Sequence, residues 1–532
     1  VIFLFGIFSR PVTAVTATTT VGEPGDADEK KTSLLLLNMA IAETEAQKQP
    51  CPQGQRQLLV VVHESDLPTL FPNDSKQRAR KSIPAILTDS SSTYLATISP
   101  GGQSSLTAGT PNIRVKDLKG KKGNPAKKND LLAGVSILGK TVRINPMTMD
   151  EGYVATRLYL DLLNHFRLTP DGKFPLTGKY AKVRYLAMND QGELKGKAIN
   201  AGLHLVNYHP VQYLKSQGSE DFQILAIARS RYNVNNVKDR LKSTLAKVGI
   251  DSSQDEEGLF RSSDVDPAKK VAPFRVEIVW TKKPKEGDPA VVAAENSANT
   301  SLLKTLLIRA YSAPNKYKEE ALYRELNEVL DIQQLFRFVA LNSLIRNGDF
   351  SDEFFWYVRK DRAGKTRLGI LPQDGDDLFK GVHMFPFTPR QISLILKGKL
   401  GVDPGYVFNF EDPLFRVLRT NDYVYFQYLS VYQKMAKSFA TSASVQRIFA
   451  DLSEQIKPYG NDPEVLARGR TDERGEAYTS ETLLGRIAQL KQLISLQAER
   501  ALGRLAPQNL VGDLLRVQRQ AEKKSSPVES QA

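Results

Sequence analysis

The first half of the chain carries short apolar runs of the length expected for β-strands. Residues 57–63 (QLLVVVH) form a continuous apolar run, which predicts a buried strand. Residues 180–188 and 201–206 predict a pair of strands around the Asn-Asp-Gln-Gly turn at 189–192. Residues 222–228 add another apolar run. We therefore expect the front half to be rich in strands.

The second half instead carries apolar residues at helical spacing. Helices are predicted over residues 302–311, 319–329, 332–345, 422–439, 444–456 and 480–505. In one of them Ile332, Leu335 and Val339 follow each other at intervals of three and four residues, which places them on one face. The front half also contains a predicted helix over 150–166. Strands followed by helices predict an α+β fold in two lobes.

Changes in composition along the chain predict its boundaries. Residues 1–17 combine an apolar run with small residues, which is typical of the back half of a signal peptide. We therefore expect export to the periplasm, the cell surface or the outside of a bacterial-type cell. Residues 18–54 predict a linker with a short helix over 33–47. A main domain is expected over 55–506, with a front lobe, an insertion, a back lobe and then a disordered tail, at residues 55–280, 281–300, 301–506 and 507–532.

Composition and charge exclude several classes of protein. Of the 532 residues, 41% are hydrophobic and 25% charged, which is ordinary for a globular protein. The net charge of +14 can attract phosphates, but the chain has no nucleic-acid-binding motif, so we expect no nucleic-acid partner. The single cysteine, Cys51, excludes an intrachain disulfide and a cysteine-based zinc site. No apolar run reaches the ~20 residues of a membrane helix, so we expect no membrane span.

The segment from 331 to 379 carries the candidate chemistry. Its first part predicts a helix that ends at Asn347-Gly348, and Asp349 follows at once. Two apolar runs, 354–358 and 368–371, are joined by a polar connection containing glycine, which predicts a β-hairpin. Asp349 precedes the first strand, and the Asp-Gly-Asp sequence at 374–376 follows the second.

The predicted hairpin brings these carboxylates together. The start of one strand and the end of its antiparallel partner lie at the same edge, about 4.8 Å apart. Asp349, Asp374 and Asp376 therefore converge, and their like charges require a cation between them. Mg²⁺ is the natural choice, because it takes oxygen ligands and pairs with substrate phosphates. Kinases use this layout, with one Asp at the hydroxyl acceptor and another on the metal.

The Asp-Gly-Asp sequence alone permits other interpretations. A strand followed by Asp-x-Asp also occurs in aspartyl-phosphate phosphatases and glycosyltransferases, and Asp376 could simply cap a helix. In the hydrolase interpretation Asp374 would be a nucleophile at the end of a parallel strand. Leu378 occupies the place where that class has Thr. The order of helix, Asn-x-Asp, hairpin and Asp-x-Asp favours the kinase interpretation.

At these motifs the chain resembles the CotH kinase family of atypical protein kinases, first associated with bacterial spore coats. The resemblance rests on Asn347-Gly348-Asp349, on the aromatic strand at 354–357 and on Pro372-Gln373-Asp374-Gly375-Asp376. It implies a two-lobed, kinase-like fold that uses ATP with Mg²⁺ or Mn²⁺. It also implies transfer of the γ-phosphoryl group to a hydroxyl of an exported protein, with Asp349 at the hydroxyl.

The chain departs from the family pattern at several places, among them the strand of Gly202, where the usual Glu is missing and Asn207 and Tyr208 lie nearby. Glu353 stands where the family has an Asn that binds metal, and Gln373 replaces a Trp. The phosphate-binding Lys expected on a front-lobe strand is missing, and the strand at 223–232 offers Arg229 and Arg231 instead. The resemblance therefore implies Asp374, Asp376 and Glu353 as metal ligands and the two arginines as nucleotide-binding residues. The alternative is a weakly active or inactive kinase-fold protein that serves as a scaffold or binding protein of the cell envelope.

Overall fold

The computed structural model describes residues 26–504 with gaps. The residues outside the description are 1–25, 49–50, 73–79, 90, 102–109, 111, 121, 127–129, 137–141, 148–152, 169–177, 209–210, 212–213, 215–221, 233–273, 283–288, 348–353, 374, 376–377, 380–412, 464, 466–479 and 505–532. The predicted signal peptide (1–17) and the predicted tail (507–532) both lie outside the described residues. The described elements form a mixed α+β fold, as the sequence predicts.

Seven strands of the front half close into a barrel, in the order β1-β2-β3-β4-β7-β9-β8. They are β1 (Gln57–His63), β2 (Ile83–Thr88), β3 (Thr93–Gly101), β4 (Asn112–Lys119), β7 (Val142–Asn145), β8 (Lys179–Met188) and β9 (Leu194–Asn207). The short strands β5 (Leu131–Leu132) and β6 (Val135–Ser136) form a separate two-stranded sheet. Neighbouring strands are antiparallel except β1 and β8, whose parallel pairing closes the barrel. The predicted turn at 189–192 is confirmed, because Asn189 Oδ1 accepts from the backbone N–H groups of Gln191 and Glu193.

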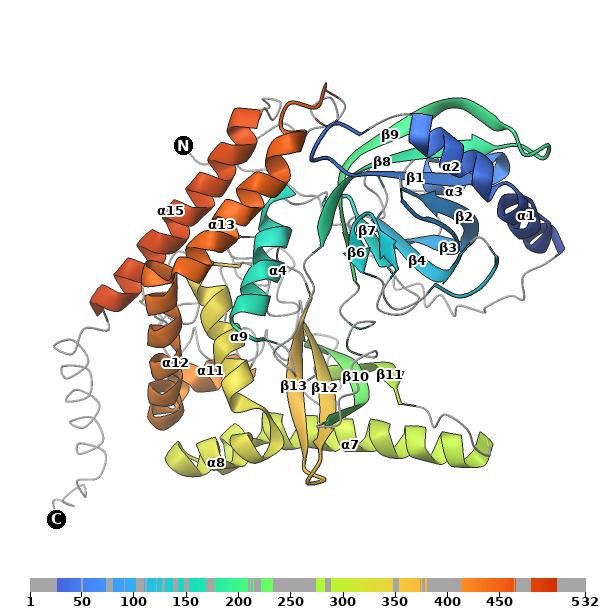
Figure 1. Cartoon of the computed structure of the whole chain (residues 1–532). Helices are drawn as coiled ribbons and strands as arrows, with labels where there is room; N and C mark the ends of the chain where they lie inside the picture. The colour runs from blue at the N-terminus through green and yellow to red at the C-terminus, as the bar shows by residue number, and fades with distance from the viewer. Residues whose placement is uncertain are drawn as a thin grey trace, which may run out of the picture.

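The strand β1 is buried on both faces, which explains its unbroken apolar sequence. Leu58, Val60 and Val62 belong to the main core. The alternate residues Leu59 and Val61 pack instead against the helices α1 (Asp26–Leu37) and α2 (Met39–Lys48). The helix predicted over 33–47 is confirmed in part, because residues 33–37 belong to α1 and 39–47 to α2. The linker predicted before it is wrong for residues 26–32, which also belong to α1, and both helices cover the barrel (Figure 1).

A second sheet combines strands from both halves of the chain. Its order is β11-β10-β12-β13, with β10 (Phe222–Tyr232), β11 (Phe274–Thr281), β12 (Phe354–Asp361) and β13 (Thr366–Pro372). The central contact is between β10 and β12, where Ala228 lies opposite Trp356 and Ile227 opposite Tyr357. The front-lobe boundary predicted at residue 280 therefore does not follow the sheets, because β10 and β11 leave the barrel and pair with the predicted back lobe.

The helices surround these sheets (Figure 1). They are α4 (Ala155–His165), α7 (Pro289–Lys316), α8 (Glu319–Val329), α9 (Ile332–Leu344), α11 (Pro413–Thr420), α12 (Asp422–Thr441), α13 (Ala443–Ile456) and α15 (Ser480–Arg504), together with the short helices α3 (Leu67–Leu70), η1 (Glu64–Asp66) and η5 (Lys457–Tyr459). The insertion predicted over 281–300 is wrong from Pro289 onward, where α7 begins. Pro is tolerated in the first helical turn, and the alanines at 290, 293 and 294 are strong helix formers that outweigh the polar residues around them.

One hydrophobic core joins the barrel to the helices. A single cluster of buried residues extends from Val60 in the barrel to Leu158 of α4, Phe336 of α9 and Ile487 of α15. The helix α4 lies between the barrel and the helices α13 and α15 (Figure 1). The two halves predicted from the sequence therefore share one interior, with α4 at its centre.

Candidate active site

The helix α9 is positioned by its first turn. Asp331 caps it by accepting from the backbone N–H of Gln334 at 3.0 Å, and also binds Arg359 of β12 at 2.9 Å. The buried Gln334 amide accepts from the Ile370 N–H at 2.9 Å, contacts the Tyr357 hydroxyl at 3.2 Å and donates to Leu168 O at 3.1 Å. One helix is therefore bound to both strands of the hairpin.

The chain leaving α9 is held by buried amides. Asn347 donates from Nδ2 to Asn342 Oδ1 at 2.9 Å and from its backbone N–H to Asn342 O at 3.0 Å. Asn342, itself fully buried, donates from Nδ2 to Phe338 O at 2.8 Å. Asn347, the first residue of the Asn-x-Asp motif, is thereby fixed relative to the helix.

The same segment is joined to the chain that follows the hairpin. Asn347 and Leu378 form an antiparallel β-bridge. The Phe379 N–H donates to Arg346 O at 3.1 Å. The residues just before Asp349 and just after Asp376 are therefore neighbours.

The predicted hairpin is confirmed. Strands β12 and β13 pair antiparallel from Phe354 opposite Pro372 to Lys360 opposite Thr366. The turn uses Gly364, whose φ of +82° is a conformation that glycine adopts without strain. This antiparallel pairing contradicts the aspartyl-phosphate hydrolase interpretation, which needs a parallel strand before the first Asp.

The four predicted acidic ligands and catalytic residues, Asp349, Glu353, Asp374 and Asp376, lie outside the described residues. Their described flanks meet at one edge of the hairpin, at the Asn347–Leu378 bridge and at the Phe354–Pro372 pair. Within the described part of the chain, no group of three or more His, Cys, Asp or Glu side chains could hold a metal ion. The assignment of these residues stays a prediction.

The two predicted nucleotide-binding arginines lie on β10. Arg229 is half-buried and lies opposite Glu277 of β11, one residue beyond the Ala228–Trp356 pair. Arg231 lies opposite Arg275, and its side chain is not described. Because β10 runs antiparallel to β12, its end lies alongside the start of β12. The structure therefore brings Arg229 toward the same edge as the flanks of the aspartates.

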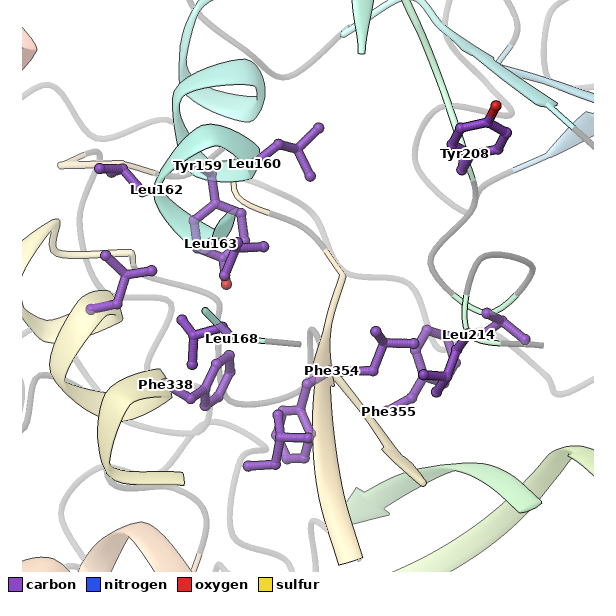
Figure 2. Packing of buried hydrophobic residues seen from close by; sticks show 14 of the residues in the cluster. Tyr159, Leu160, Leu162, Leu163, Leu168, Tyr208, Leu214, Phe338, Phe354 and Phe355 are labelled. Carbon is purple, nitrogen blue, oxygen red and sulfur yellow. The ribbon is translucent and has the colours of Figure 1, made fainter. Parts of the chain in front are cut away.

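The contact between Tyr159 and Gly375 has almost no signal in the sequence. A Cβ atom added at Gly375 would lie 2.1 Å from Tyr159 Cδ1, so the tyrosine ring packs directly on the backbone of Gly375. Figure 2 shows Tyr159 projecting from α4 into the packed region that also holds Leu168, Phe338 and Phe354. The only hint in the sequence is glycine itself, which is often found where another group approaches the backbone closely.

The helix α4 is held by a buried ion pair on its other side. Arg157 donates from Nε to Asp161 Oδ2 at 3.0 Å, and from Nη1 to Gln455 Oε1 of α13 at 2.8 Å and to Gly178 O. Burial raises the pKa of Asp161, while Arg157 acts in the opposite direction. These contacts fix α4, and with it Tyr159, between β8 and α13.

Comparison with known proteins adds one family match. A sequence model of the family described as CotH kinase protein matches residues 112–467, more than half of the chain. The match extends from β4 to the segment after η5 and includes the whole candidate site. No curated protein shows a significant sequence match. No helix among the described residues is long and apolar enough to cross a membrane.

Proposed function

Because the chain belongs to the CotH kinase family of kinase-like phosphotransferases, we propose that it transfers the γ-phosphoryl group of ATP to hydroxyl side chains of an exported protein. One observation carries the proposal beyond the family. The chain before Asp349 is bridged to the chain after Asp376 through Asn347 and Leu378, and the hairpin joins their other flanks. This is the arrangement that a hydroxyl-orienting Asp and a metal-binding Asp require.

The residues present fit a divalent cation. Asp374, Asp376 and Glu353 would supply hard oxygen ligands, which suit Mg²⁺ or Mn²⁺. The ion, when bound, neutralises charge on the ATP phosphates. Arg229, with Arg231 beside it on β10, would bind phosphate oxygens through its guanidinium group. The barrel and the helical part would form the two lobes of a kinase-like fold.

In the proposed reaction Asp349 orients the acceptor hydroxyl and takes its proton. The hydroxyl oxygen of Ser, Thr or Tyr forms a bond to the γ-phosphorus as the bond to the β,γ-bridging oxygen breaks, and ADP leaves. The protein contributes by positioning the groups and by stabilising charge. The buried Asn342–Asn347 pair, which fixes the chain just before Asp349, serves that positioning.

A second candidate function is a non-catalytic binding protein on the same fold. One observation favours it: the strand β10 (FQILAIARSRY) has arginines and no lysine. Arg recognises phosphate as a planar fork and does not reproduce the point charge of Lys. In that case nucleotide would bind without transfer.

The test is phosphoryl transfer by the purified chain. The protein is incubated with γ-labelled ATP and either Mg²⁺ or Mn²⁺, beside Asp374→Ala and the matched control Asp451→Ala, which removes an exposed carboxylate from α13. We expect label on the wild type and the control, and a loss of at least about 10²-fold in Asp374→Ala, since charge stabilisation contributes on this scale.

The two functions give different results in this assay. Metal-dependent ATP binding without label on any protein would favour the non-catalytic function. A folded wild-type chain that binds no nucleotide with either metal would contradict both. Label that persists unchanged in Asp374→Ala would contradict the assignment of that residue.

A further inference from the structure

A row of polar residues crosses four neighbouring strands of the barrel. Ser99 of β3 lies opposite Arg114 of β4, Arg114 opposite Arg143 of β7, and Arg143 opposite Asn207 of β9. Residues directly opposite each other in an antiparallel ladder share one face of the sheet, with Cβ atoms about 5 Å apart. These four residues, called the arginine row below, therefore form one continuous line.

The arginine row lies on the outer face of the barrel. Its neighbours along β4 and β7 are Ile113, Val115 and Ile144, which are buried in the main core. Side chains alternate between the two faces of a strand, so Arg114 and Arg143 point away from that core. Arg114 is exposed and Arg143 half-buried.

The positive charge of the row has no paired carboxylate among the described residues. Arg143 donates from Nε to Asn112 Oδ1 at 3.2 Å, and no hydrogen bond or ion pair joins Arg114 to another described residue. Within the described part of the chain, no carboxylate pairs with either guanidinium group. Partial burial, followed by the charges of Arg143 and Arg80, lowers the pKa of Arg114. Like charges directly opposite on a sheet destabilise it, so an anion bound between them would remove this repulsion.

The buried end of the row offers a hydrogen-bond acceptor. Asn207 is 5% exposed, and its Oδ1 atom is buried without a hydrogen-bond partner. An unsatisfied buried acceptor destabilises the fold, and a donor on a ligand would satisfy it. A ligand that complements the row thus carries negative oxygens for the arginines and one O–H for Asn207.

We propose that the arginine row, on the outer face of the barrel, is a binding site for a phosphate group. The tetrahedral oxygens of phosphate match the planar donor fork of Arg, and two adjacent guanidinium groups can each bind them in bidentate fashion. A phosphate monoester has its second pKa near about 6, so a fraction keeps the O–H that Asn207 would accept. The phosphate belongs either to a small molecule or to a phosphorylated side chain. The site does not depend on catalysis by this protein.

The experiment measures binding of two probes to the full chain by isothermal titration calorimetry. The probes are inorganic phosphate and a short phosphoserine peptide, with sodium chloride at equal ionic strength as the control for screening. The variants are Arg114→Gln, Arg143→Gln and their combination, beside Arg324→Gln, which removes an exposed arginine from α8. Arg114→Lys keeps the positive charge but loses the planar, bidentate N–H donors of the guanidinium group.

We expect the wild type and Arg324→Gln to bind phosphate equally, and the double variant to bind at least about tenfold more weakly, since two charge-assisted contacts are lost. The affinity of Arg114→Lys for phosphate should lie between those of the wild type and the double variant. This variant keeps the test decisive if the double variant fails to fold. Tighter binding of the phosphoserine peptide identifies a phosphorylated side chain as the source, and tighter binding of inorganic phosphate identifies a small anion. The proposal is overturned if chloride binds as tightly as phosphate, or if the double variant binds phosphate as tightly as the wild type. Either result would show an adventitious charge effect only.

Discussion

At the scale of single residues, Gly375 has the least room for change. The ring of Tyr159 occupies the position that a Cβ atom would take, and Tyr159 is itself fixed by the contacts of α4. A side chain at 375 must displace either α4 or the backbone of Gly375 itself. Because α4 is buried on all sides, we expect the added atom to displace the backbone at Gly375.

We therefore predict that Gly375→Ala lowers phosphoryl transfer by about 10²-fold, which is the effect of moving a reacting group by about 1 Å. The measurement is the initial rate of label transfer from ATP. Gly485→Ala, at a position in α15 with nothing within 4 Å of the added Cβ, is the control and should keep full activity. Partial recovery in Gly375→Ala combined with Tyr159→Ala would confirm the cause, and wild-type activity of Gly375→Ala alone would contradict it.

The buried hydroxyl of Tyr357 makes the free energy of unfolding depend on pH in the alkaline range. Burial raises the pKa of its hydroxyl above the ordinary value of 10, so the folded state keeps its proton where the unfolded state loses it. Its contribution to stability is thus complete below pH 10 and is lost as the pH rises above 10. We predict that, above pH 10, the free energy of unfolding of Tyr357→Phe rises relative to that of the wild type by up to about 1.4 kcal/mol per pH unit.

Urea unfolding of both proteins between pH 8 and 11 measures this difference. The hydrogen bond between Tyr357 and Gln334, which Phe lacks, shifts the two curves by an offset that does not change with pH. Parallel curves across the whole range would refute the prediction.

At the scale of elements, Gln334 couples α9 to the hairpin. Its amide serves three groups on three segments, namely the Ile370 N–H, the Tyr357 hydroxyl and the Leu168 carbonyl. An apolar side chain of similar size would leave the Ile370 N–H and the Leu168 carbonyl buried without partners. The position of the hairpin relative to α9 sets where its edge meets the chain that carries Asp349.

We predict that Gln334→Leu lowers the free energy of unfolding by about 2–5 kcal/mol, the cost of leaving two buried backbone groups unsatisfied. Chemical denaturation measures it. The control Gln489→Leu, at an exposed position of α15, should change stability by no more than about 0.5 kcal/mol. Equal stability of the two variants would show that water or a shift of the backbone satisfies those groups.

At the scale of the whole molecule, a buried ion pair joins the barrel to the C-terminal helices. Lys182 of β8 and Asp462, which follows η5, lie 3.0 Å apart with side chains 6% and 5% exposed. Tyr459 strengthens the same contact by donating to Tyr180 O at 3.0 Å and accepting from the Arg56 N–H at 2.7 Å. The two halves of the chain are thus joined through polar contacts as well as through the core.

We predict that Lys182→Met lowers the free energy of unfolding by about 3–5 kcal/mol, because it removes the cation that lies 3.0 Å from the buried Asp462 carboxylate. Lys182→Met combined with Asp462→Leu should be more stable than Lys182→Met alone, since the buried negative charge is then removed together with its cation. Thermal or urea unfolding measures both. Lys195→Met, which breaks an exposed pair with Glu193, should change the free energy of unfolding far less than Lys182→Met. A double variant less stable than the single one would contradict the argument.

The local sequence pattern was sufficient to predict the parts of the candidate site that are consecutive along the chain. The helix before Asn347, the turn at Gly364 and both strands of the hairpin all depend on hydrogen bonds between residues close in sequence. Periodicity and turn residues encode such bonds directly. The positions of Asp349 and of Asp374 at the two ends of that hairpin follow from the same local order.

Local pattern failed where the partner is distant. The parallel pairing of β1 with β8 joins residues more than a hundred positions apart, and β10 could as well have continued the barrel as joined β12. The sequence predicts α7 too short, because the polar residues of its first turns obscure the helix propensity of the alanines among them. Strand pairing is decided by which face of each strand can be buried. A face can be buried only once the elements that cover it are in place.

The sequence by itself thus determined the α+β class, the hairpin and the order of the acidic motifs, and its resemblance to CotH kinases agrees with the family match. Only the tertiary structure decided that Tyr159 packs on Gly375 and that Arg114 and Arg143 lie side by side. The physical reason is the same for both contacts. Neither pair is linked by local hydrogen bonding, so each arises from the register and packing of whole elements, which no short stretch of sequence contains.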